Sequence, residues 1–305
     1  MNTPIKTIAV IGAGAMGACY ASKLYEMDKN CISFVAAGNR YDPLKENGLV
    51  VNGKHYFFNV IRPEEQAPPS DFIIVAVKHH HLGSAIRDIR NRVGVDSLIL
   101  SIMNGIESEE QIASVYGADK VLYGVAVGID AVRENNSITF SQQGKLIFGE
   151  ANNFHLTERV LRVQSLFNQA GIIYETPEDM IRTLWWKFMI NVGINQVSAA
   201  LGAPYAVFQN SQEARELMES AMREVITIAK AEGIHLVEDD IENWNSFLST
   251  LSPQGKTSML QDVEAKRKTE VEMFAGKVIE LGKKYSIPMP INQTLYRLIK
   301  VIEGM

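Results

Sequence analysis

The chain has 305 residues, of which 46% are hydrophobic and 21% are charged, a balance typical of a globular protein with at least one sizeable core. Its 30 basic and 35 acidic side chains give a net charge of −5, so no excess of positive charge favours a nucleic-acid partner. The two cysteines, Cys19 and Cys31, are too few for a disulfide framework, and their apolar surroundings indicate buried hydrophobic side chains.

The sequence predicts no membrane association. No basic N-terminal region followed by an apolar segment opens the chain, as a secretory signal would require. The stretch Leu184–Leu201 approaches the length of a membrane span, but its lysine, asparagine and glutamine residues argue against insertion. We therefore expect a cytoplasmic protein.

The first half of the chain alternates short β-branched runs with helical stretches. Four of these runs predict strands: Thr7–Ile11, Ile32–Ala36, Phe72–Val77 and Leu98–Met103. The last two are continuously apolar, which is typical of parallel strands covered on both faces. The alternation of strand and helix predicts an α/β domain with a doubly wound sheet.

Short antiparallel strands are expected beside this sheet. The dipeptide Asn52-Gly53 separates two β-rich runs within Gly48–Val60 and is a strong hairpin signal. Ser137–Phe140 and Lys145–Phe148 also predict antiparallel strands, at the far end of the same domain.

After Tyr174 the pattern becomes helical. Thr176 and Pro177 supply an N-cap hydroxyl and a proline at the first helical position. We therefore divide the chain into a dinucleotide-binding domain of Rossmann type, 1–174, and an all-helical domain, 175–305, with the functional site expected in the cleft between them. Helices are expected at about 177–200, 211–232, 237–250, 257–284 and 290–303.

A glycine-rich loop follows the first predicted strand. In a strand–loop–helix setting, its glycines allow a tight turn, close approach of a pyrophosphate and tight helix packing. The helix N-terminus adds free N–H groups and a partial positive charge. We interpret this G-x-G-x-x-G loop as a dinucleotide site, formed by Gly12, Ala13, Gly14, Ala15, Met16 and Gly17.

The end of the second predicted strand bears on the choice between NAD and NADP. No acidic residue follows it to hold a ribose 2′-hydroxyl, and Arg40 is the nearest cation for a 2′-phosphate. NADPH is therefore the expected cofactor, with NADH as the alternative. A solvated loop charge is the other interpretation of Arg40.

Polar side chains occur where ligands are expected. Lys78 and Asn104 each follow a buried strand, and ligands bind at the carboxyl ends of parallel strands. Lys187, Asn191 and Asn195 recur every four residues in an otherwise apolar stretch, so a helix places them on one face. Left unpaired in a core they would be costly, so this face is expected to look toward a ligand.

Two further segments carry candidate groups. Ser258 and Glu270 lie on or near the helix predicted over 257–284, and a glutamate beside a buried lysine would offset and orient its charge. The alternative interpretation places Glu270 on a solvated, charge-rich helix face. The three adjacent histidines, His79–His81, lack the spaced ligands of a zinc site, so we predict no metal.

Taken together, these motifs resemble the ketopantoate reductase (2-dehydropantoate 2-reductase) family. The resemblance covers nearly the whole chain and rests on GAGAMG, VKHHH, MNG, LWWKFMINVGIN, SMLQD followed by KTE, and IPMPINQTLY. It implies a homodimer that binds NADPH and a small 2-oxo acid, ketopantoate, and transfers a hydride to the ketone to give pantoate.

The resemblance also implies roles for individual residues. Lys187 would be the catalytic proton donor and Glu270 its catalytic partner. The implied cofactor contacts are Lys78 and Asn104, and the implied substrate contacts are Asn104, Asn191, Asn195 and Ser258.

Three positions depart from the pattern of that family. Ala37 stands where an arginine usually clamps the 2′-phosphate, Gln196 where a proline often follows the second asparagine, and Tyr205 where an asparagine sometimes contacts the substrate. Ser258 and Glu270 are also about 18 Å apart along a straight helix. Both reach one small ligand only if Ser258 precedes the helix or the segment bends.

Two rivals to ketopantoate reduction follow from the same residues. A related dehydrogenase acting on another small 2-oxo or 3-hydroxy acid would share the fold and the lysine. A dinucleotide-binding sensor that turns nothing over would share the glycine loop, but it has no need of a proton donor such as Lys187.

Overall fold

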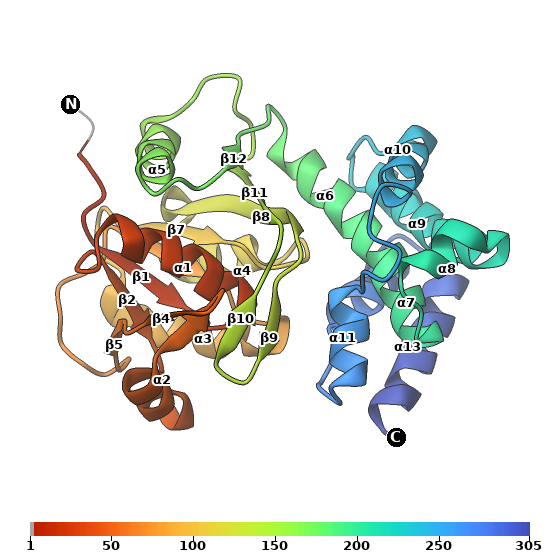
Figure 1. Ribbon diagram of the computed structural model, residues 1–305. Helices are drawn as coiled ribbons and strands as arrows, with labels where there is room; N and C mark the ends of the chain where they lie inside the picture. The colour runs from red at the N-terminus through yellow and green to blue at the C-terminus, as the bar shows by residue number, and fades with distance from the viewer. Residues whose placement is uncertain (1–2) are drawn as a thin grey trace. The chain divides into compact units, whose positions relative to one another are not determined.

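The computed structural model describes residues 3–305, and the chain folds into two compact units that divide between Ile181 and Arg182. Figure 1 shows the first unit from red to light green and the second from green to blue. No helix within residues 3–305 is long and apolar enough to cross a membrane.

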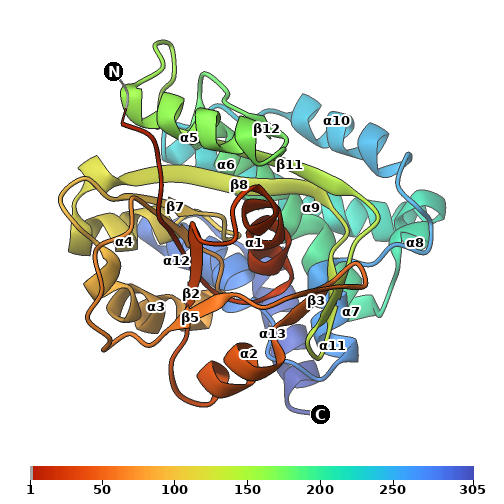
Figure 2. The ribbon, with the colours of Figure 1, turned by 60° about the vertical axis from the view of Figure 1, so that its left-hand side comes forward.

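An eight-stranded sheet forms the centre of the first unit, in the order β12-β11-β8-β7-β6-β1-β2-β5. All strands from β8 to β5 in this order run parallel, whereas β11 pairs antiparallel with β8, and the two long strands lie side by side in Figure 2. The doubly wound α/β sheet predicted from the sequence is confirmed. The strands are β1 Ile8–Ile11, β2 Ile32–Val35, β5 Asn59–Ile61, β6 Phe72–Val75, β7 Leu98–Ser101, β8 Val121–Ile129, β11 Gln143–Gly149 and β12 Tyr174–Glu175.

Side chains that alternate along the central strands build a core on each face of this sheet. In β1, Ile8 and Val10 join one buried cluster, while Ala9 and Ile11 join the other. This is why the strands read as continuous apolar runs, since neither face meets water. Helices α1 Ala15–Met27 and α5 Glu158–Gln169 cover the first face, and α3 Leu82–Asp88 and α4 Ser108–Tyr116 cover the second; α2 Tyr41–Asn47 follows β2.

A second, four-stranded sheet lies against α1. Asn52 and Gly53 have φ of 47° and 79° and join β3 to β4, which confirms the predicted hairpin. Val51 and Ile138 pack into the same buried cluster as α1. The sheet has the order β4-β3-β10-β9, with β3 Leu49–Val51, β4 Lys54–Tyr56, β9 Val132–Glu134 and β10 Ser137–Thr139.

The two strands predicted near residues 137–148 are both antiparallel to a neighbour, but they lie in different sheets. β10 pairs with β9 in the small sheet, and β11 pairs with β8 in the large one.

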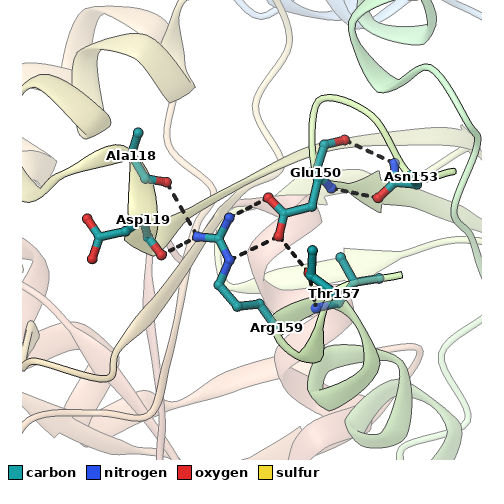
Figure 3. A network of polar contacts seen from close by, with 7 residues as sticks. Ala118, Asp119, Glu150, Asn153, Thr157 and Arg159 are labelled. Carbon is teal, nitrogen blue, oxygen red and sulfur yellow. Dashed lines mark hydrogen bonds and ion pairs between the residues drawn. The ribbon is translucent and has the colours of Figure 1, made fainter. Parts of the chain in front are cut away.

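An ion-pair network fixes the end of β11 (Figure 3). Glu150 accepts hydrogen bonds from Thr157 Oγ1 (2.7 Å) and Arg159 Nε (3.0 Å), and Arg159 Nη1 also donates to the carbonyl of Asp119. The side chain of Asn153 closes the turn by accepting from the Glu150 N–H (2.9 Å). The start of α5 is thereby tied to the segment before β8.

The second unit is helical, as the sequence predicts. Two short π-helices interrupt the α-helices, and Figure 1 shows α6, α7, α9, α11 and α13 of this unit. Its helices are α6 Met180–Ile190, η5 Asn191–Asn195, α7 Gln196–Leu201, α8 Tyr205–Asn210, α9 Gln212–Ala231, α10 Glu238–Leu248, α11 Ser258–Glu264, η6 Glu272–Gly276, α12 Lys277–Lys284 and α13 Pro290–Glu303.

The predicted cap at Thr176 and Pro177 is wrong, because α6 begins at Met180. The side-chain Nδ2 of Asn153 donates to the Pro177 carbonyl (2.8 Å), and the Asn153 N–H donates to the Glu178 carbonyl (2.8 Å). This segment therefore pairs with the loop after β11 before the helix starts.

The single helix predicted over 257–284 is also wrong. α11 ends at Glu264, and Lys266 adopts a φ of 52°, in the left-handed region that ends helices. Arg267 stabilises the break, since its N–H donates to the Asp262 carbonyl (2.8 Å) and its Nε donates to Asp262 Oδ1 (2.9 Å). Helical structure resumes at η6.

Candidate functional site

The glycine loop has a shape that only glycine allows at two of its positions. Gly12 has a φ of 106°, and a Cβ there would lie 2.4 Å from the Ala76 carbonyl oxygen. A Cβ on Gly17 would lie 1.9 Å from the Gly12 carbonyl oxygen. By contrast, a Cβ on Gly14 would meet no atom within 4 Å. Gly12 and Gly17 therefore serve packing, whereas Gly14 borders open space.

The N-terminus of α1 begins beside that space. Gly14 is the N-cap residue, and within the described residues no side chain caps this end and no acid occupies the first turn. The first N–H groups and the positive end of the helix dipole are thus available to an anion. The loop and helix fit the pyrophosphate of a dinucleotide.

Lys78 and Asn104 lie at the carboxyl edge of the sheet, as predicted. β6 pairs with β1 on one side and β7 on the other, and Lys78 follows β6 while Asn104 follows β7. The strand order reverses between β1 and β6, which is where open α/β sheets bind ligands. Both side chains are partly buried.

Arg40 and the histidine run meet at the same edge. Arg40 Nη2 lies 2.8 Å from His81 Nε2. Burial, and then the charges of Arg40 and Lys78, lower the pKa of His81, so its ring is neutral and accepts the hydrogen bond. Within residues 3–305, no three His, Cys, Asp or Glu side chains gather in a way that could hold a metal ion.

In the second unit, Lys187, Asn191 and Asn195 follow one another along α6 and η5. A step of four residues overshoots a full α-helical turn by about 40°, so three such residues drift around an α-helix. The π-helix η5 is wider and winds less per residue, which offsets this drift between Asn191 and Asn195. The π-helix therefore helps to keep the three polar side chains on one face.

Burial lowers the pKa of Lys187 from 10.5 to about 8. In the described part of the chain, no acidic side chain makes an ion pair with this lysine. An ammonium that is partly buried among apolar neighbours loses hydration, which favours its neutral form. At neutral pH it is therefore a charged group that gives up its proton more readily than a solvated lysine.

Ser258 lies next to Asn195. The Nδ2 of Asn195 is 3.5 Å from Ser258 Oγ. Ser258 is the first residue of α11, whose N-cap is Thr257, and Thr257 Oγ1 donates to Ser198 Oγ (3.1 Å) on α7. The link between Thr257 and Ser198 holds Ser258 beside the polar face.

Glu270 lies beyond the break that follows α11. Its backbone carbonyl accepts from the N–H groups of Met273 (3.0 Å) and Phe274 (3.1 Å), so Glu270 starts the helical turn of η6. Its side chain is partly buried, unlike those of residues 264–268, which does not fit the solvated-face interpretation. The predicted pairing of Glu270 with Lys187 is not formed within the described residues, because Lys187 makes no ion pair there. The role of Glu270 as the catalytic partner of the lysine stays a prediction.

Sequence reasoning missed the residue that supports both π-helices. Gln196 is fully buried, and its Nε2 donates to the Val192 carbonyl (2.7 Å) and to Asn292 Oδ1 (3.0 Å). Its Oε1 accepts from the N–H of Ala275 in η6 (3.0 Å). Gln196 thus satisfies backbone groups of η5 and η6 at once. The sequence marks Gln196 only as a departure from the family pattern beside Asn195.

A buried carboxyl group near Asn104 was also missed. Glu109, which is 3% exposed, accepts from Ser108 Oγ (2.8 Å), and Ser108 Oγ lies 2.7 Å from Ser101 Oγ at the end of β7. Burial raises the pKa of Glu109 to about 7. These contacts fix both ends of the loop that carries Asn104. In the sequence, Glu109 belongs to the run E-S-E-E at 107–110, which is typical of acidic residues in the first turn of a helix. The sequence pattern therefore does not reveal that its carboxyl group is buried.

Known proteins resemble this chain in sequence and in structure. A 2-dehydropantoate 2-reductase from Pyrococcus horikoshii is 25% identical over 305 residues, and the match covers 98% of each chain. The crystal structure of 2-dehydropantoate 2-reductase from Geobacter metallireducens superposes with a TM-score of 0.85 at 26% identity, covering 96% of this chain and 99% of that one. A D-mandelate dehydrogenase in complex with NADH and anilino(oxo)acetate has a TM-score of 0.88 at 22% identity, with 98% of each chain covered.

The family comparison accounts for most of the chain. Residues 8–153 match the family described as ketopantoate reductase PanE/ApbA, and residues 179–303 match its C-terminal domain. These two matches contain the glycine loop, the polar face of α6 and η5, and the segment from Ser258 to Glu270. The chain therefore belongs to the ketopantoate reductase family of oxidoreductases.

Proposed function

We propose that this protein is an NADPH-dependent 2-dehydropantoate 2-reductase of the cytoplasm, forming pantoate for pantothenate and coenzyme A synthesis, and that it acts as a homodimer. The observation that carries the proposal is the face formed by Lys187, Asn191 and Asn195. It combines a desolvated ammonium whose pKa is about 8 with two amides that are 3% and 6% exposed. A protein that only binds a dinucleotide has no use for such a proton donor.

Each group has a chemical role in the proposed reduction. A bound NADPH supplies the hydride that the ketone carbon accepts. The Nζ of Lys187 donates its proton to the oxygen of that ketone as it becomes an alkoxide, and its charge stabilises the developing anion. Asn191, Asn195 and Ser258 would hold the 2-oxo acid by hydrogen bonds. Lys78, Asn104 and the glycine loop would hold the dinucleotide.

Turnover of a substrate panel tests this function. The purified protein is mixed with NADPH or NADH and with ketopantoate or other 2-oxo acids, and nicotinamide oxidation is followed by absorbance. We expect the highest kcat/KM with NADPH and ketopantoate. Cofactor binding without turnover of any acid would instead indicate a sensor. Light scattering of the same sample measures the oligomeric state.

The rate should depend on pH through Lys187. The protonated lysine is the acid, so the active form is present below the pKa of about 8 and is lost as the pH rises through it. We expect kcat/KM for ketone reduction to fall about tenfold per pH unit above this pKa, and the oxidation of the alcohol product to show the opposite trend. A profile for reduction that stays flat from pH 7 to about pH 10 would contradict the assignment.

One observation favours a second substrate class. The ring of Tyr205 lies against Gly255, where a Cβ would approach its Cδ2 to 2.7 Å, and the Tyr205 N–H donates to the Gly255 carbonyl (3.0 Å). Gly255 is three residues before Ser258. An aromatic ring near this serine suits a 2-oxo acid with a larger apolar group. A higher kcat/KM with phenylglyoxylate than with ketopantoate would select this alternative.

A further inference from the structure

Arg133 contacts the glycine loop from an element outside the central sheet. It lies on β9, and its Nη1 donates to the carbonyl oxygen of Ala13, 120 positions earlier in the chain. Its Nε donates to the Asn135 carbonyl (2.7 Å), which fixes the guanidinium on its own strand turn. Two of its five N–H groups are used in this way, so three remain for a ligand.

A second guanidinium lies within electrostatic reach of Arg133. Burial, and then the positive charge of Arg40, lower the pKa of Arg133. Arg40 is held in place by the neutral ring of His81, which adds no negative charge. Asp88 lies within the electrostatic reach of Arg40 without forming an ion pair with it.

The two arginines have no acidic partner. In the part of the chain that the structure describes, neither guanidinium makes an ion pair with a carboxylate. Like charges that interact without a counter-charge repel each other, and an anion bound by both relieves the repulsion. Planar guanidinium groups bind phosphate through paired hydrogen bonds, so phosphate is the anion that we expect these two arginines to bind.

We propose that Arg133 and Arg40 together bind the 2′-phosphate of the dinucleotide, and that Arg133 supplies the guanidinium that the methyl side chain of Ala37 cannot provide. This inference rests on the proposed dinucleotide function. Arg40 follows β2, the strand whose end addresses the ribose 2′ position in this type of sheet. Arg133 reaches the same place from β9, so the selectivity for a 2′-phosphate is shared between two distant parts of the sequence.

Calorimetric titration of the ligand-free protein with adenosine fragments tests this proposal. Adenosine 2′,5′-bisphosphate carries the 2′-phosphate, and 5′-AMP lacks it. The variants are Arg133→Ala, and Arg133→Gln, which keeps an N–H donor for Ala13 while removing the charge. Arg90→Ala serves as the matched control, because Arg90 is an exposed arginine of the same unit. Thermal unfolding of each variant reports its stability.

We expect both Arg133 variants to bind the bisphosphate about tenfold or more weakly while their affinity for 5′-AMP changes less than about twofold. Arg40→Ala should behave alike, and Arg90→Ala should match the unaltered protein. Equal losses for the two fragments, or no loss in a folded Arg133→Gln, would overturn the role of Arg133. If the unaltered protein binds neither fragment nor NADPH, the proposed dinucleotide function itself fails.

Discussion

Replacing Lys187 with alanine is expected to lower kcat by on the order of 10²-fold or more, the scale of general acid catalysis, with the fold intact. The lysine is partly buried on the polar face of α6 and η5, and burial has already lowered its pKa to about 8. Because it makes no ion pair within the described residues, its removal leaves no carboxylate without a partner. Stability should therefore change much less than activity.

A second variant separates chemistry from packing. Lys187→Met keeps most of the aliphatic stem and removes the ammonium, so it should be as inactive as Lys187→Ala and at least as stable. Lys230→Ala is the matched control, since Lys230 is an exposed lysine of the same unit, on α9. Steady-state kinetics and thermal unfolding are measured for all three. A kcat close to that of the unaltered protein in Lys187→Met would remove Lys187 from the role of proton donor.

The parts of the candidate site whose local structure could be predicted from the sequence are those encoded by neighbouring residues. The glycine loop is recognisable because its turn, its helix start and its strand lie within residues 8–27. Lys187, Asn191 and Asn195 are recognisable because their spacing by four places them near one helix face, and the π-helix η5 then brings them closer to alignment. In the first case a strand–turn–helix motif is recognised, and in the second the helical repeat is recognised. Both depend only on residues that are close in the sequence.

The parts that were mispredicted depend on contacts between distant residues. The break after α11 is stabilised by Arg267 and Asp262, and by Thr269, whose Oγ1 donates to Glu303 Oε1 (2.6 Å) on the last helix. Periodicity across 257–284 cannot reveal a contact with residue 303. The break also removes the expected difficulty that Ser258 and Glu270 lie far apart along one straight helix, because they belong to two helical segments.

Arg133 illustrates the same limit within the first unit. Its strand is short, and its partner Ala13 is 120 residues away, so nothing in the local pattern singles it out. Gln196 appears in the sequence only as a departure from a family pattern. In the structure its side chain bonds to Val192, Ala275 and Asn292, which explains how a glutamine is accommodated in this buried position.

Substitution of two glycines of the loop should lower the stability of the fold by different amounts. Gly17→Ala places a Cβ 1.9 Å from the Gly12 carbonyl oxygen, a backbone atom that cannot move aside without distorting the loop. We expect it to cost about 1–3 kcal/mol of unfolding free energy, or more, as overpacking does. Gly14→Ala meets no atom within 4 Å, so its effect on stability should be below about 1 kcal/mol, the scale of a changed N-cap.

Gly14 should matter for cofactor affinity, although it matters little for stability. A side chain on Gly14 would occupy the open space beside the N-terminus of α1, where a pyrophosphate needs to approach the backbone. Gly14→Val should therefore weaken NADPH binding roughly ten- to a hundredfold, which corresponds to a clash of about 1–3 kcal/mol. Denaturant unfolding and nicotinamide fluorescence titration measure the two quantities on the same samples. Gly83→Ala, at an exposed position of α3 where a Cβ would meet only the Arg87 side chain at 3.9 Å, is the control for the intrinsic cost of replacing a glycine. If Gly14→Val binds NADPH as tightly as the unaltered protein, the pyrophosphate does not lie beside Gly14, and the open space there has another purpose.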